Sequence, residues 1–217
     1  MKHFPLFALL LAAAAVATAT PVTLTLTPVL DPGPYYQQTT NNPCVIGEPS
    51  CSAPSGWTWT VFPAGASSYT NVTSPTYDVS EITGIVGSTS FMIGVDVNQT
   101  NVVQTLGFFG MYVNGSLVAE YNPASPTLVP PTSGGGNGNG YADYLLTGFS
   151  LAGFQPNDDV YFKVTMPLVN DGREQFFLIS ATSPEPPPQV PEPATSALIG
   201  GGLIGLGLLS RRFRNQQ

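Results

Sequence analysis

Apolar and polar residues alternate with period two in several runs of the central chain. The pattern is clear over residues 22–26, over residues 57–61, where both tryptophans share one face, and over residues 91–97, where Asp96 lies opposite the apolar positions. Alternation at this period places one face of a β-strand against a core. No window shows an apolar stripe of helical period with capping residues at its ends. The pattern therefore predicts an all-β body.

Turn sequences divide these runs into short strands. Asn114-Gly115 lies between residues 108–113 and 116–121, and Asn-Gly favours a type I′ hairpin because both positions need a positive φ. Polar turns are also expected to join strands at two other places, residues 98–101 between 91–97 and 102–109, and residues 170–172 between 160–169 and 174–181. This spacing favours a single β-sandwich over residues 20–182, with a jelly roll as one arrangement of its strands.

Two segments have low complexity. Residues 123–140 are rich in proline, glycine and asparagine, which predicts a long surface loop without a core of its own. Residues 183–193 contain six prolines, which predicts an extended stalk.

The N-terminus has the three parts of a secretory signal peptide. Lys2 supplies the positive start, residues 6–16 are apolar, and Ala17-Thr18-Ala19 offers small residues to signal peptidase. We therefore expect residues 1–19 to be removed on export.

The C-terminus ends in an apolar run and a basic cluster. Residues 194–209 are apolar and glycine-rich, and the final segment, residues 210–217, contains Arg211, Arg212 and Arg214. Residues 194–209 are somewhat shorter than the ~20 residues of a straight membrane-spanning helix, but they suffice for a thin or deformed bilayer. Arginines cross the bilayer at high cost, so the tail is expected to span the membrane with these residues in the cytoplasm.

These parts, together with Pro191, Glu192 and Pro193 just before the apolar run, resemble the PEP-CTERM sorting signal. The same module also carries the label "ice-binding protein C-terminal domain". The resemblance covers residues 190–214 only. It implies a bacterial protein whose tail is removed by an exosortase, with Pro191-Glu192-Pro193 as the recognition motif. It further implies export to the cell surface or to an exopolysaccharide matrix.

The charge of the central chain excludes one class of partner. Residues 20–193 hold thirteen acidic and two basic residues, Lys163 and Arg173, which gives a formal net charge of −11. Such a surface repels nucleic acid. We therefore expect no nucleic-acid partner, and contact with the membrane only through the tail before processing.

Histidine and cysteine usage limits the chemistry further. The only histidine, His3, lies in the signal peptide, so the mature chain has no Ser-His-Asp or Cys-His system and no histidine-ligated metal site. Cys44 and Cys51 are the only cysteines, and in an oxidising compartment they are expected to form a disulfide.

The remaining candidates are carboxylates and aromatic rings. Four aspartates, Asp96, Asp143, Asp158 and Asp159, could form a calcium site if the fold gathered them, yet the segment from Asp96 lacks the glycine and glutamate of an EF-hand loop. Turn residues are the favoured interpretation, and no metal or cofactor is predicted. Trp57 and Trp59, with Tyr35 and Tyr36 upstream, could form a sugar-binding platform, but core packing is favoured.

The sequence thus predicts a non-enzymatic, exported protein of the cell surface or the exopolysaccharide matrix. A carbohydrate-binding module that uses aromatic residues and calcium is the first alternative. A glycan-active enzyme that uses two carboxylates is the second, because glycoside hydrolysis needs such a pair.

Overall fold

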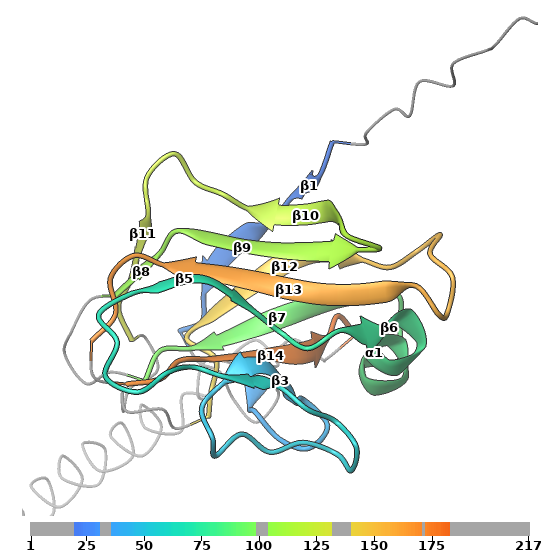
Figure 1. The fold of residues 1–217 in the computed structure, drawn as a ribbon, viewed down its shortest axis with the longest axis horizontal. Coiled ribbons are helices and arrows are strands. Elements are labelled where there is room, and N and C mark those ends of the chain that lie inside the picture. The colour runs from blue at the N-terminus through green and yellow to red at the C-terminus, as the bar shows by residue number, and fades with distance from the viewer. Residues whose placement is uncertain (1–19, 31–35, 99–103, 132–139, 171, 183–217) are drawn as a thin grey trace, which may run out of the picture.

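The computed structural model describes residues 20–30, 36–98, 104–131, 140–170 and 172–182, and its body is built of β-strands, which confirms the all-β class (Figure 1). The predicted signal peptide, stalk, transmembrane helix and basic tail lie outside the described residues. Within the described residues, no helix is both long and apolar enough to cross a bilayer.

Most strands belong to two sheets of six strands each. The first sheet has the order β1-β10-β9-β13-β5, with β6 also beside β13, and the second has the order β2-β12-β7-β14-β3-β4. The strands of the first sheet are β1 (Val22–Thr23), β5 (Tyr69–Thr73), β6 (Tyr77–Asp78), β9 (Phe108–Val113), β10 (Ser116–Tyr121) and β13 (Asp159–Met166). Those of the second sheet are β2 (Thr25–Pro28), β3 (Cys44–Gly47), β4 (Thr60–Val61), β7 (Ser90–Asp96), β12 (Tyr144–Ser150) and β14 (Gln175–Ser180).

The longer strands pair in a nested series. The innermost pair is β9 with β10, followed outward along the chain by β7 with β12, β5 with β13, and β3 with β14, all antiparallel. Further pairs, β9 with β13 and β7 with β14, join these nested pairs into the two sheets. The chain therefore follows the path of one long hairpin that is rolled on itself.

The two sheets share one core. Aromatic rings meet across it: Phe109 of β9 stacks on Phe176 of β14 at a centroid distance of 5.3 Å, and Phe91 of β7 meets Phe162 of β13 edge-on at 6.2 Å. Phe91, Ile93, Val95 and Val97 are buried in this core, as the sequence predicts, but Gly94 and Asp96 between them are buried as well, so both faces of β7 are covered.

A second, smaller cluster covers the other face of the second sheet. Its members come from β3, β12 and β14 and from the chain near them: Val29, Tyr36, Cys44, Cys51, Ala142, Leu145, Phe177 and Ile179, with Trp59 and Met92 of β7 packed against them. The side chain of Gln38 and the backbone of Ser52 bind this cover together, since Gln38 Nε2 donates to the Ser52 carbonyl at 2.6 Å and Gln38 Oε1 accepts from the Ser52 amide at 3.0 Å.

One of the predicted turns is a hairpin and two are not. Asn114 and Gly115 join β9 to β10 with φ of 49° and 78°, as a type I′ turn requires. In contrast, the strands on either side of residues 170–172, β13 and β14, lie in different sheets, and β7 pairs with neither β8 nor β9. These two pairs of strands therefore do not form hairpins.

Three other details differ from the sequence prediction. A helix, α1 (Val79–Val86), follows β6, although no helical stripe was expected. The run over residues 22–26 is split, because β1 joins the first sheet and β2 the second, with Leu24 buried between them. Within the predicted loop at 123–140, β11 (Thr127–Val129) pairs with β8 (Gln104–Leu106) as a third, two-stranded sheet.

Candidate functional site

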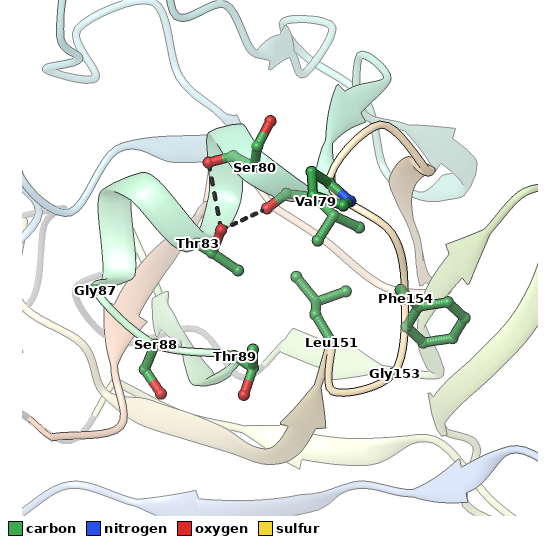
Figure 2. A pocket seen from close by; sticks show the side chains of 10 residues that line it. Val79, Ser80, Thr83, Gly87, Ser88, Thr89, Leu151, Gly153 and Phe154 are labelled. Atoms are coloured by element: carbon green, nitrogen blue, oxygen red, sulfur yellow. Dashed lines mark hydrogen bonds between the residues drawn. The ribbon is translucent and has the colours of Figure 1, made fainter.

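A cavity of about 390 Å³ lies between α1 and the turn that follows β12 (Figure 2). Ten residues from α1, its C-terminal connection and this turn line it: Val79, Ser80, Thr83, Gly87, Ser88, Thr89, Leu151, Gly153, Phe154 and Pro156. Its size falls within the range of small-ligand sites.

Helix α1 is fixed to the turn by backbone hydrogen bonds. The amide of Val79 donates to the carbonyl of Asp158 at 3.0 Å, and the amide of Ser80 donates to the carbonyl of Pro156 at 2.9 Å. The amide of Asp78 donates to the Glu81 carboxylate at 2.7 Å, and the helix ends at Gly87 with a φ of 69°. Backbone hydrogen bonds thus fix α1, which forms one wall of the cavity, to the turn that forms the other.

The lining combines apolar groups with hydroxyls and carries no ionisable side chain. Figure 2 shows the hydroxyl of Thr83 bound to the helix, where it donates to the carbonyl of Val79 at 2.9 Å. Ser88 Oγ accepts a hydrogen bond from the Ser90 amide at 3.1 Å. Without a group that titrates near neutral pH, the lining cannot supply general acid–base catalysis. Its chemistry suits a neutral ligand that has both apolar and hydroxyl surface.

The four candidate aspartates lie at opposite ends of the domain, with Asp158 and Asp159 at the start of β13 in the first sheet and Asp96 and Asp143 in the second sheet. Asp158 and Asp159 lie at the α1 end, where the hydrogen bond from the Asn114 side chain to Asp158 at 2.9 Å, followed by that from the Gln155 amide, lowers the pKa of Asp158. Asp96 and Asp143 lie at the other end, beside the adjacent ends of β7 and β12. The fold therefore gathers them as two pairs and not as one site.

Asp96 and Asp143 are sealed from solvent, with an exposed fraction of 1% each. Burial first and the charge of Asp143 second raise the pKa of Asp96 to about 8, against a hydrogen bond from the Gly140 amide to Asp96 at 2.9 Å. The Asp143 carboxylate accepts from the Val97 amide at 2.7 Å. Backbone donors thus stabilise this pair inside the protein, away from any large substrate.

Sequence reasoning missed two buried polar residues near this pair. Glu174 and Gln104 are completely buried, and neither side chain makes a hydrogen bond of good geometry within the described part of the chain. Burial raises the pKa of Glu174 to about 7, and the nearby Gln104 offsets part of that increase. No linear signal marks them, since 70 residues separate Gln104 from Glu174 in the chain. Among the described residues, no group of three or more histidine, cysteine, aspartate or glutamate side chains could hold a metal ion.

Of the aromatic residues considered as a sugar platform, Trp57 and Trp59 are half-buried and pack against the two apolar clusters, which agrees with the favoured interpretation. Trp57 stacks on Tyr77 at 4.3 Å and donates to the carbonyl of Cys44 at 2.8 Å. Trp59 donates to the carbonyl of Glu48 at 2.9 Å, and Tyr36 is buried. Tyr35 lies outside the described residues.

The disulfide prediction is confirmed. Cys44 and Cys51 are joined with a Cα–Cα distance of 6.1 Å, and the bond lies in the cover of the second sheet. A disulfide-bonded, β-rich domain with acidic composition is typical of exported proteins.

Comparison with protein families finds one match, the PEP-CTERM protein-sorting motif at residues 189–212. This tail holds the predicted motif Pro191-Glu192-Pro193 and the arginines, and it lies outside the described residues. The motif implies that the chain is exported and anchored in the membrane before an exosortase cleaves it. Neither the curated proteins nor the solved structures contain a match to the chain.

Proposed function

We propose that the chain is a non-enzymatic protein of the bacterial cell surface or exopolysaccharide matrix, delivered there by removal of its two terminal signals. The observation that carries this proposal is the sorting motif at residues 189–212 behind a disulfide-bonded β-rich body. In this proposal signal peptidase removes residues 1–19 and exosortase acts near Pro191-Glu192-Pro193. Residues 194–209 hold the chain in the membrane until then, with residues 210–217 in the cytoplasm.

The described residues support a role without catalysis. The cavity beside α1 has no ionisable lining residue, and the close pair Asp96 and Asp143 is sealed. Asp158 is held in a turn by two hydrogen-bond donors. A glycan-active enzyme would instead need two carboxylates that face an open cleft.

We also infer that residues 20–182 form a jelly-roll sandwich. The nested pairs from β9 with β10 outward to β3 with β14 support this inference, because a jelly roll is a double-sheet fold built from Greek keys. Carbohydrate binding remains the alternative function. The observation in its favour is the hydroxyl-lined cavity with Phe154 at its rim, which has the chemistry of a sugar site.

The intact mass of the protein recovered from its native host tests the proposal. We expect a chain that lacks residues 1–19 and the apolar tail, and that is 2 Da lighter for the disulfide. In a Glu192→Ala variant we expect the tail to remain and the protein to stay in the membrane fraction, whereas Glu185→Ala, in the same proline-rich segment, serves as the matched control. A full-length mass for the wild-type protein at the cell surface would contradict the proposal.

A further inference from the structure

The outer face of the first sheet carries a stacked pair of tyrosines. Tyr112 of β9 lies directly opposite Tyr161 of β13 in the antiparallel register, and their rings stack at a centroid distance of 4.9 Å with an angle of 4° between planes. Both are half-buried, whereas their strand neighbours Met111 and Phe162 point inward and are completely buried. The tyrosine pair therefore stands on the side of the sheet that faces away from the core.

Lys163 lies over this pair. Its Nζ is 4.8 Å from the centre of the Tyr112 ring and 5.5 Å from the centre of the Tyr161 ring, which is the geometry of cation–π contacts. Lys163 is the only lysine in the chain besides Lys2, in a body of strongly negative net charge. Within the described residues, no carboxylate forms an ion pair with this ammonium group.

The side chains around the pair leave its polar groups available. Within the described part of the chain, neither tyrosine hydroxyl has a hydrogen-bond partner, while the half-buried Phe108 and Leu117 extend the apolar surface over Gly110. Thr73 of β5 lies opposite Lys163 in the register and adds an exposed hydroxyl-bearing residue. Figure 1 shows no described helix or strand across this face. The Thr73 hydroxyl donates to the Asn71 carbonyl at 3.1 Å. The face thus joins the Lys163 ammonium, the two tyrosine hydroxyls and aromatic rings.

We propose that this face, centred on Tyr112, Tyr161 and Lys163, binds a polysaccharide that carries carboxylate groups. The ammonium of Lys163 pairs with a carboxylate of the ligand, and the tyrosine rings and hydroxyls contact the adjoining sugar. Charge complementarity selects this occupant, because Lys163 forms no ion pair with a carboxylate of the described residues. Glu120 of β10, opposite Gly110 in the register, is the carboxylate whose charge acts on this face: after burial and Tyr161, it raises the pKa of Tyr112. Charges more than about 8 Å away are largely screened at physiological ionic strength. The inference rests on the proposed association with an exopolysaccharide matrix.

Binding of the full chain in detergent to immobilised polygalacturonate tests this inference, with neutral dextran and dextran sulfate as comparison polymers. We expect retention on polygalacturonate only. Lys163→Gln removes the cation and leaves a shorter, neutral polar side chain, and it is expected to weaken binding about tenfold, the loss typical of a hydrogen bond to a charged group. Tyr161→Phe keeps the ring, removes one hydroxyl and is expected to weaken binding less.

Gln155→Glu is the matched control, because it lowers the net charge by the same amount at an exposed turn beside α1. We expect this variant to bind within about twofold of the wild-type chain, and circular dichroism verifies that each variant is folded. Failure of the wild-type chain to bind, equal losses in Lys163→Gln and Gln155→Glu, or equal retention on dextran sulfate would each overturn the proposal. Because the purified chain is used, these results are independent of whether the tail is processed in the host.

Discussion

The outer faces of the two sheets differ in what lies on them. On the second sheet, Phe177 and Ile179 are buried under a cover that contains the disulfide and Trp59. On the first sheet, Tyr112, Tyr161 and Lys163 are only half-buried. The sequences of two strands reflect this difference. β14 is apolar along most of its length, whereas buried residues of β13 alternate with residues that are exposed or half-buried. A strand that is buried on both faces loses its alternation, whereas a strand with one open face keeps it.

The largest expected effect is the dependence of folding stability on pH, which tests whether the cover of the second sheet excludes water. Asp96 lies on the covered side of the second sheet with an ordinary pKa of 3.8 and a pKa of about 8 in the folded chain, which burial causes first. Below pH 4 it is protonated in both states, and between pH 4 and pH 8 only the unfolded chain releases the proton. Stability therefore falls across this range, and above pH 8 the full cost remains.

Glu174, with a folded pKa of about 7, acts in the same direction. The charges that face Asp96 are Asp143, Glu48 and Glu174. Urea unfolding is expected to show greater stability at pH 5 than at pH 8, by several kcal/mol, and Asp96→Asn should remove most of this slope. A slope that Asp96→Asn leaves unchanged would show that the cover does not isolate this carboxyl from water.

Removal of the disulfide is the next largest change. The bond joins residues that are seven apart in sequence, so the chain-entropy estimate for the Cys44→Ala/Cys51→Ala double variant is a loss of about 2–3 kcal/mol. Urea unfolding of this variant and of the wild-type chain under identical conditions measures the loss. An unchanged midpoint would mean that the cover is held by its apolar contacts alone.

Two glycines offer a matched comparison of the faces. A Cβ at Gly94 of β7 would lie 2.6 Å from the ring of Phe177, which is completely buried, and a Cβ at Gly110 of β9 would lie 2.6 Å from the ring of Phe108, which is half-buried. Phe177 has no room to move, so Gly94→Ala is expected to cost about 1–3 kcal/mol. Phe108 can turn toward solvent, so Gly110→Ala should cost less than about 1 kcal/mol. Equal losses in thermal unfolding would disprove the proposed difference in packing.

The smallest effect is expected on the open face. Tyr161→Leu removes the ring stack with Tyr112 and is expected to cost about 0.5–1 kcal/mol, as cross-strand pairs contribute. Phe162→Leu, one residue further along β13, alters the shared core and should cost more. A greater loss of unfolding free energy for Tyr161→Leu than for Phe162→Leu in urea unfolding would contradict this order. It would show that the tyrosine pair stabilises the fold and that this face is not open.

Features that depend on residues close together in the chain could be predicted from the sequence. The sorting motif, the disulfide and the Asn114-Gly115 hairpin each depend on neighbours along the chain, and each is confirmed. Helix α1 was missed because it has only eight residues with a glycine among them. Asp78 and Glu81 at its start and Gly87 at its end are nevertheless residues typical of helix caps.

Long-range pairing was not accessible in the same way. Asp96 meets Asp143 only because β7 pairs with β12, and Tyr112 meets Tyr161 only because β9 pairs with β13. Alternation fixes which face a side chain takes, but it contains no information on which strand lies beside it. Trp57 and Trp59 illustrate this limit, because they share one face in the alternating pattern of residues 57–61 but pack against different clusters. Trp57 packs against the main core and Trp59 against the cover of the second sheet.

The position of the last residue of β14 shows from which end of the domain the chain continues toward the sorting motif. Ser180 pairs with Phe91, so the chain leaves the second sheet at the end that also holds Ser88 and Thr89 of the cavity. The eleven residues 183–193 reach at most about 40 Å. In the proposed anchored state, the cavity therefore lies at the end of the domain from which the chain runs toward the membrane, whereas Lys163 lies on the outer face of the first sheet.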